Sequence, residues 1–189
     1  MRPIRVIACS AAAAAISISA TAKPRIYTNA EYGIALPIAS GELLCRAPKN
    51  EHDHGPALLL GTSSTRGCRD SGHHRSIAIF ATYTIEAEDP PSYLNDECTR
   101  GAMGGPCQPA PAGLEIAGLA SASARVNHPD GRIEIVVVAQ AGTPDPAFDP
   151  VVPPFSYDLS LYTTPEHLEE DLRVFRTVLK TIRLSPPGK

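Results

Sequence analysis

The sequence predicts an α+β fold: a mainly antiparallel β-sheet with a C-terminal amphipathic helix packed on one face and at most one further short helix. Two observations lead to this prediction. Most of the chain consists of short apolar segments separated by Gly and Pro, and the 19 prolines in 189 residues favour strands joined by fixed turns. One segment near the C-terminus instead repeats its apolar residues at helical spacing.

Alternating or short apolar segments predict the strands in chain order. In the segment 76–85, Ile77 and Ile79 share one face, while Ala78 and Phe80 make the other face apolar as well. A strand that is apolar on both faces is expected to be central and covered twice. Strands are expected at residues 25–28, 33–37, 42–45, 57–60, 76–85, 114–126, 132–140 and 157–163.

The segments 114–126 and 132–140 are expected to form a hairpin. Residues 127–131 between them read Asn-His-Pro-Asp-Gly, in which Pro fixes φ and Gly tolerates a positive φ. Small residues share one face of the first arm, so another element is expected to approach it closely; they are Gly118, Ala120, Ala122 and Ala124. The proline-rich and glycine-rich segments 101–113 and 142–154 are expected to be long surface loops.

Two helices are expected. Thr164 is a candidate N-cap of the C-terminal helix, and Pro165 suits the first helical position. The apolar face of this helix consists of Leu168, Leu172, Phe175, Leu179 and Ile182. A shorter helix is expected to start at Asp89-Pro90-Pro91-Ser92 and to end by Cys98.

The first 22 residues have the three parts of a secretory signal peptide. Arg2 and Arg5 precede an apolar stretch of small residues, and Ala20-Thr21-Ala22 forms an A-x-A cleavage site. The apolar stretch is short for a membrane anchor. We therefore expect a signal peptide at residues 1–22, cleavage near Ala22, and a periplasmic or secreted single domain at residues 23–189.

Four cysteines remain after removal of the leader, an even number that predicts two disulfides in an oxidising compartment. Four cysteines allow three pairings. Cys45 with Cys68 and Cys98 with Cys107 is the favoured one, because each pair closes a short, turn-rich loop. A zinc site is the alternative, but the C-x-x-C spacing typical of such sites is absent.

Two chain ends resemble a known group of secreted domains. Tyr27-x-Asn29 followed by Tyr32-Gly33-Ile34-x-Leu36-Pro37 resembles the opening hairpin of PsbP-like and DcrB-like domains. Leu172-x-x-Phe175-x-x-Val178-Leu179-x-x-Ile182 is similar to their final helix. The aromatic motif that often follows the opening proline in that group is absent, as is tryptophan. The resemblance covers about a fifth of the chain, implies a small extracytoplasmic binding or assembly-helper module, and assigns no functional residue.

One histidine-rich cluster has ligand chemistry. His52 and His54 project from the same side of an extended segment, and His73 or His74 is expected to reach over as a third ligand for zinc or copper. Solvated, unpaired loop histidines are the simpler interpretation. His128, in the hairpin turn, is expected to be exposed.

Composition excludes several functions. The net charge of −3 becomes −5 once Arg2 and Arg5 leave with the leader, which disfavours nucleic acid and anionic membranes as partners. The motifs G-x-S-x-G, S-x-x-K, H-E-x-x-H and the P-loop are all absent. The sequence therefore favours a non-enzymatic exported binding module without a cofactor, of the inhibitor or immunity type, whose partner is another envelope protein. The alternatives are a metal-binding protein that uses the His52, His54, His73 and His74 cluster, and a hydrolase.

Overall fold

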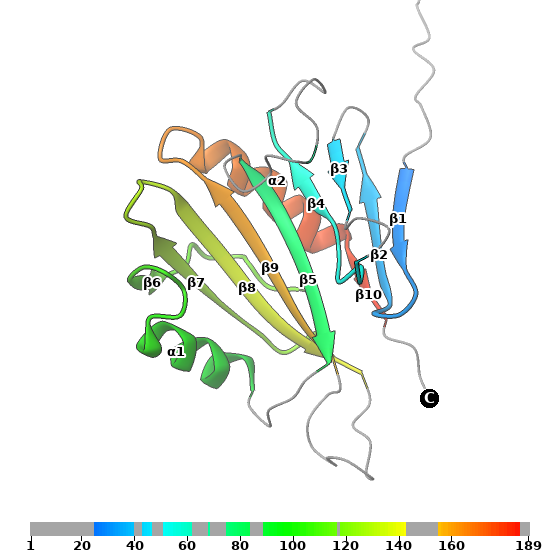
Figure 1. Ribbon diagram of the computed structural model, residues 1–189, viewed down its shortest axis with the longest axis horizontal. Helices are drawn as coiled ribbons and strands as arrows, with labels where there is room; N and C mark the ends of the chain where they lie inside the picture. The colour runs from blue at the N-terminus through cyan, green and yellow to red at the C-terminus, as the bar shows by residue number, and fades with distance from the viewer. Residues whose placement is uncertain are drawn as a thin grey trace, which may run out of the picture.

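The structure is a computed structural model and describes residues 25–39, 43–46, 51–61, 68, 75–83, 89–116, 118–142 and 155–185. Its elements form an α+β fold dominated by antiparallel strands (Figure 1). Neither described helix is long and apolar enough to cross a membrane. In chain order the elements are β1 (Arg25–Asn29), β2 (Ile34–Ile38), β3 (Leu43–Cys45), β4 (Ala57–Leu59), β5 (Ser76–Tyr83), α1 (Pro90–Arg100), β6 (Cys107–Pro109), β7 (Ser121–Asn127), β8 (Ile133–Ala141), β9 (Phe155–Thr163), α2 (Leu168–Thr181) and β10 (Arg183–Leu184).

The described strands form two sheets. Seven strands pair in the order β3-β4-β5-β9-β8-β7-β6, and β1, β2 and β10 form a three-stranded sheet. Every pairing is antiparallel. The predicted hairpin is confirmed for β7 and β8, where Asn127 pairs with Ile133 and Gly131 has φ +85° in the turn.

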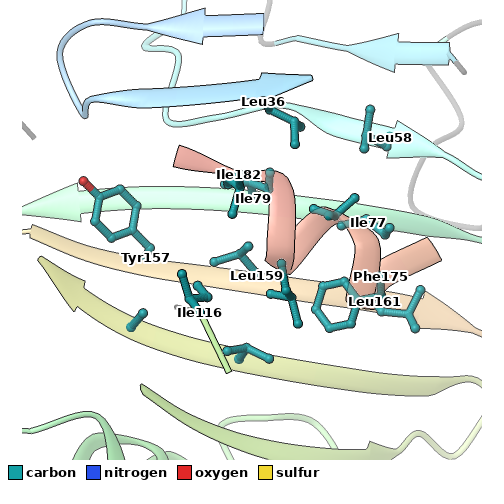
Figure 2. Packing of buried hydrophobic residues seen from close by; sticks show 14 of the residues in the cluster. Leu36, Leu58, Ile77, Ile79, Ile116, Tyr157, Leu159, Leu161, Phe175 and Ile182 are labelled. Carbon is teal, nitrogen blue, oxygen red and sulfur yellow. The ribbon is translucent and has the colours of Figure 1, made fainter. Parts of the chain in front are cut away.

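The main core lies on the inner face of the seven-stranded sheet, beneath α2 and the small sheet. Phe175 of α2 and Ile182, the residue that follows the helix, lie in one buried cluster with Leu159 and Leu161 of β9 (Figure 2). Leu36, from the small sheet, belongs to the same buried cluster. The apolar face of α2 predicted from its spacing is therefore the face that closes the core.

A second cluster lies on the opposite, outer face of the large sheet. Leu94 of α1 packs there against Ala124 of β7 and against Val136 and Val138 of β8. The small residues of β7 allow this close approach, as their pattern predicts. Because α2 covers the inner face and α1 the outer face, all nine residues of β8 are buried.

The expectation that β5 is covered on both faces is wrong. The strand is interior in the sheet, and Ile77 and Ile79 are buried on its inner face. However, α1 covers β7 and β8 and leaves β5 open, so Phe80 remains 48% exposed on the outer face.

Other boundaries differ from the expectations. The C-terminal helix begins at Leu168, because residues 165–167 form a turn and His167 occupies the N-cap without a side-chain bond. Residues 114–116 and 118–120 lie outside β7, which begins at Ser121, and the Leu119 N–H donates to the Ile116 carbonyl in a turn. The presumed loop 101–113 contains β6, which pairs with β7. The helix α1 begins as predicted, with the Asp89 carboxylate accepting from the Ser92 N–H, and continues two residues past Cys98 to Arg100, before Gly101 at φ +70°.

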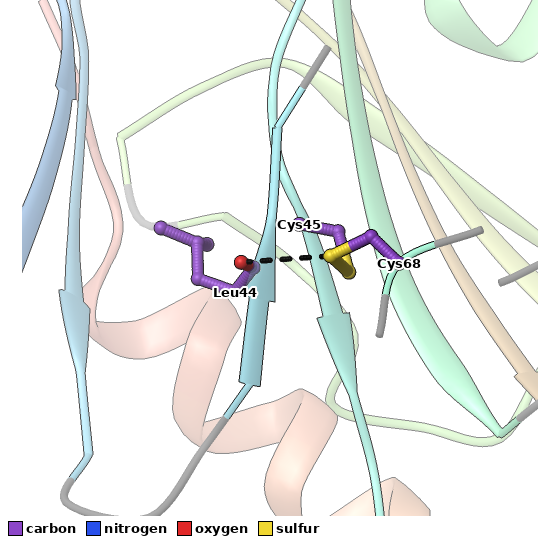
Figure 3. Close-up of a disulfide and its surroundings, with 3 residues drawn as sticks. All are labelled: Leu44, Cys45 and Cys68. Atoms are coloured by element: carbon purple, nitrogen blue, oxygen red, sulfur yellow. Dashed lines mark hydrogen bonds between the residues drawn. A yellow bond between two sulfur atoms is a disulfide. The ribbon is translucent and has the colours of Figure 1, made fainter. Parts of the chain in front are cut away.

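Both favoured disulfides are present. Cys45–Cys68 has a Cα–Cα distance of 5.4 Å and holds residue 68 beside β3 (Figure 3). Cys98–Cys107, with a Cα–Cα distance of 5.7 Å, joins α1 to β6. The Leu44 carbonyl oxygen lies 3.9 Å from Sγ of Cys68. This is a packing contact, because a disulfide sulfur has no proton to donate.

Candidate functional site: a histidine–aromatic cluster

The turn between β1 and β2 fixes the position of Tyr32. Asn29 Oδ1 accepts hydrogen bonds from the backbone N–H groups of Glu31 and Tyr32, at 3.0 and 3.3 Å. This is the Asx chemistry that makes asparagine a turn residue. The hydroxyl of Tyr157 on β9 donates to the Tyr32 carbonyl at 2.6 Å and anchors the turn from below.

The same hairpin holds the segment before β4. The amide of Asn29 donates to the Asp53 carbonyl, and the Tyr27 hydroxyl donates to Asp53 Oδ1 at 3.1 Å. Asp53 Oδ1 also accepts from the Gly55 N–H at 3.2 Å. Burial is the main cause that raises the pKa of Tyr27 to about 12, so its hydroxyl stays a donor at physiological pH.

Gly55 sets how this segment joins β5. Its φ of +149° favours glycine, and a Cβ atom there would lie 2.2 Å from the Ile79 carbonyl oxygen. The backbone on either side pairs with β5, because Ile79 N–H donates to Pro56 O and Ala81 N–H donates to His54 O. Gly55 thereby brings His54 against the strand that carries Phe80.

These constraints assemble a histidine–aromatic cluster at one end of the fold. His54 stacks on Tyr32 and on Phe80, with ring centroids 5.6 and 4.8 Å apart. Tyr32 and Phe155 each contact Tyr83, at centroid distances of 5.8 and 5.2 Å. We use the name histidine–aromatic cluster for Tyr32, His52, His54, Phe80, Tyr83 and Phe155.

Two side chains of this cluster, Phe80 and Tyr83, are exposed to solvent, while others are buried beneath them. Tyr32 is buried, whereas Phe80 is 48% and Tyr83 51% exposed. Burial is the main cause that raises the pKa of the Tyr32 phenol, followed by the nearby Glu31 carboxylate. The cluster therefore presents aromatic side chains at the surface, next to a tyrosine that hydrogen bonds hold in place.

Two of the four predicted metal-ligand residues lie together. The rings of His52 and His54 are 4.9 Å apart, and the Tyr32 hydroxyl lies 3.2 Å from a nitrogen of each. His52 Nε2 also lies 2.9 Å from Glu31 Oε1. His73 and His74 lie outside the described residues, and within those residues no group of three or more His, Cys, Asp or Glu side chains is arranged to hold a metal ion.

The proton of His54 is fixed by its surroundings. Its Nδ1 lies 2.8 Å from the Ala81 carbonyl oxygen, which can only accept, so Nδ1 carries the proton. In the neutral imidazole, Nε2 is then the nitrogen with the lone pair. A backbone carbonyl that fixes an imidazole in this way is also a common arrangement behind metal-ligating histidines.

A polar network lies on the outer face, and it corrects the expectation for His128. The His128 side chain is only 15% exposed, and its Nε2 lies 3.0 Å from Glu134 Oε2. Ser160 donates to Glu134 Oε1 at 2.7 Å. Because His128 contacts the buried Glu134 carboxylate, its side chain lies against the sheet and does not extend from the hairpin turn into solvent.

Asp158 of β9 lies beside this network. Its cross-strand partner on β5 is Phe80, so both side chains are on the outer face. Burial, together with the Glu97 and Glu134 carboxylates, raises the pKa of Asp158 to about 6. Among the described residues, Asp158 has no basic partner.

Sequence reasoning identified His52 and His54 but not the aromatic side chains around them. Tyr32 was visible only as part of the hairpin motif, and Phe80 was assigned to a covered face. The polar residue Asp158, in register beside Phe80 on an interior strand, is the sequence signal that the outer face is not apolar across its whole width. Ser63, Ser64 and Asp70, which could form a hydrolase site together with a histidine, lie outside the residues that the structure describes.

Comparison with known proteins identifies the fold. The sequence matches no family model and no curated protein at a significant level. In structure, the chain is similar to the solution structure of cyanobacterial PsbP (CyanoP) from Synechocystis sp. PCC 6803, with a TM-score of 0.51 and 10% sequence identity. The similarity covers 95% of this chain and 99% of that one. The chain therefore has the PsbP-like fold, as the hairpin and helix motifs at its two ends suggested.

Proposed function

We propose that the chain is an exported, non-enzymatic binding module that docks another envelope protein through the exposed part of the histidine–aromatic cluster. One observation carries the proposal. The large apolar side chains exposed among the described residues are Ile26, Phe80 and Tyr83, and the last two belong to this one cluster. Aromatic side chains held rigidly at a surface are typical anchors of protein interfaces.

The rigid base favours binding. Tyr32 and His54 are held by bonds to Tyr157, Ala81 and the backbone, so the aromatic surface loses little side-chain freedom when a partner covers it. The PsbP-like fold is compatible with such a small non-enzymatic domain. An inhibitor or immunity-type role against an envelope enzyme fits this surface.

Export supports the same proposal. Two disulfides are typical of proteins that fold in an oxidising compartment. The leader pattern in residues 1–22 leads to the same compartment, the periplasm or the exterior, with residues 23–189 as the mature domain. Edman sequencing of the protein purified from envelope extract tests this, and an N-terminus at Lys23 is the expected result.

Site-specific photo-crosslinking tests the docking surface. A photoreactive phenylalanine is placed at position 80, and in a matched variant at position 26, which is 61% exposed on β1. In envelope extract, position 80 is expected to give one dominant protein adduct that position 26 does not give. Equal adduct patterns at the two positions, or none at position 80, would contradict the proposal.

A metal-binding function is the second candidate, favoured by the distance of 4.9 Å between the ring centroids of His52 and His54 and by the Ala81 carbonyl that orients the His54 ring. His73 and His74 would have to supply the remaining ligands. Calorimetric titration with Zn²⁺ and Cu²⁺ tests it. Replacement of His52 and His54 by alanine should abolish sub-micromolar binding, whereas replacement of His167 should leave it unchanged. Equal binding by both variants would exclude the cluster.

A further inference from the structure

Phe80 lies between two different neighbours on the outer face. Stacking on His54, at a centroid distance of 4.8 Å and an interplanar angle of 25°, covers one face of its ring. Asp158 stands on β9, the strand on the opposite side of β5, directly in register with Phe80. The exposed Phe80 ring and the partly buried Asp158 carboxylate are thus side by side on the outer face, next to the part of the sheet that α1 covers.

The charge around this position is negative. Glu97 on α1 and Glu134 on β8 both act electrostatically on Asp158. The two glutamates have basic partners, Arg100 and His128, whereas no described basic side chain pairs with Asp158. Of the three carboxylates Glu97, Glu134 and Asp158, Asp158 is therefore the partly buried one that has no basic partner among the described residues.

We propose that the outer face at Phe80 and Asp158 receives an Arg or Lys side chain of the partner protein, with the ring of Phe80 in contact with the cation and the Asp158 carboxylate beside it. The inference rests on the proposed function and adds the chemistry of the partner. Charge complementarity is the reason: a cation over an aromatic ring gains from the ring quadrupole, and it neutralises a carboxylate that has no basic partner among the described residues.

Binding of a cation should depend on pH. Asp158 has a pKa of about 6, and the ionisable groups that face it are Glu97 of α1 and Glu134 of β8, the latter paired with His128. An arriving cation favours the ionised carboxylate and lowers its pKa, so binding below pH 6 must displace a proton. Affinity is therefore expected to be lower at pH 5 than at pH 8.

An NMR titration of the full oxidised chain tests the site directly. The probe is the peptide acetyl-Gly-Arg-Gly-amide, and acetyl-Gly-Gln-Gly-amide is the neutral control. The arginine peptide is expected to shift the amide signals of Phe80 and Asp158 at pH 8, and the glutamine peptide is not. Identical shifts with the two peptides, or none with the arginine peptide, would overturn the inference.

Substitutions at Asp158 and Phe80 test whether these two side chains bind the arginine peptide. Asp158→Asn and Phe80→Leu should each weaken binding of the arginine peptide roughly threefold or more, and Asp158→Asn should remove the pH dependence. Glu115→Gln, an exposed charge change elsewhere, should bind as the wild type does. Wild-type affinity in Asp158→Asn would overturn the inference.

Binding of the Phe80 and Asp158 variants to the crosslinked partner distinguishes a failure of this inference from a failure of the proposed function. If Phe80→Ala loses the partner and Asp158→Asn keeps it at every pH, the surface docks a partner but the cation site is wrong. If both variants keep the partner, the proposed docking surface is wrong as well. Loss in both variants, with wild-type spectra elsewhere, supports the two together.

Discussion

Arg75 and Asp171 form a two-armed ion pair between the start of β5 and the first turns of α2. Arg75 Nε lies 2.8 Å from Asp171 Oδ2, and its Nη2 donates to Oδ1. Thr163, at the end of β9, donates to the same carboxylate at 2.6 Å. Asp171 is 1% exposed, so this one carboxylate joins two strands to the helix that closes the core.

Replacement of Asp171 by Asn is expected to destabilise the protein strongly. The variant leaves the Arg75 guanidinium without its buried counter-charge, which typically costs about 3–5 kcal/mol. Glu170→Gln is the matched control, because Glu170 contacts the same Arg75 at 3.2 Å but is 61% exposed, and its loss should cost less than about 1 kcal/mol. Urea unfolding compares the two, and similar losses would show that burial does not set the strength of this pair.

Asp158→Asn is expected to stabilise the protein at pH 8. The folded-state pKa of Asp158, about 6, is above its ordinary value of 3.8, so the folded protein favours the protonated carboxyl. The free energy of unfolding is therefore highest below pH 4, where Asp158 is protonated, and falls as pH rises through 6 and the carboxyl ionises. The variant should gain at most roughly 3 kcal/mol at pH 8 and almost nothing at pH 4. Denaturant unfolding across this range checks it, with the exposed Asp96→Asn as the control. A gain that is independent of pH would contradict the account.

Gly55→Ala is expected to destabilise by more than about 2 kcal/mol, since the added Cβ meets the Ile79 carbonyl oxygen at a backbone conformation that disfavours alanine. Gly101→Ala has a comparable backbone constraint, φ +70°, but open space around it, and should cost about 1 kcal/mol. Thermal unfolding gives the comparison. A smaller loss at Gly55 than at Gly101 would show that the segment before β4 shifts without cost.

The two disulfides are expected to contribute unequally. Loop-closure entropy gives about 3.4 kcal/mol for Cys45–Cys68, with a sequence separation of 23, and about 2.7 kcal/mol for Cys98–Cys107, with a separation of 9. Paired Cys→Ser variants, unfolded in urea, measure each contribution. The reverse order would indicate that the attachment of α1 to β6 matters more than loop length.

Much of the fold was predictable because its signals are local. The α2 face repeats Leu172, Phe175 and Leu179 at helical spacing, and β9 alternates apolar and polar residues over most of its length. The β7–β8 turn and the cysteine pairing follow from short-range chemistry. These features need no knowledge of what packs against them.

The errors concern tertiary contacts. Pro165 suits a helix start in sequence, but regular helix begins only at Leu168. The first turn of the helix is held by tertiary contacts, since the Asp171 carboxylate accepts from Arg75 and Thr163. His128 looks exposed in sequence because its partner Glu134 lies across a turn. Phe80 looks buried because its residue type is apolar, while the position of α1 leaves it open.

The site was predictable only in part for the same reason. His52 and His54 are two residues apart in sequence, so an extended backbone places their side chains on the same side. Tyr32 and Phe80 join them through Gly55 and Asn29, two small turn residues whose partners are far along the chain. The aromatic surface exists only after these long-range bonds have formed.

The affinity of the crosslinked partner for Phe80→Ala tests the central claim most directly. The wild type, Phe80→Ala and Ile26→Ala are compared by surface binding measurements, after circular dichroism has shown equal folding. The account predicts a loss of about tenfold or more in affinity for Phe80→Ala, as for an aromatic anchor, and none for Ile26→Ala. Wild-type affinity in Phe80→Ala would contradict the assignment of the histidine–aromatic cluster as the docking surface.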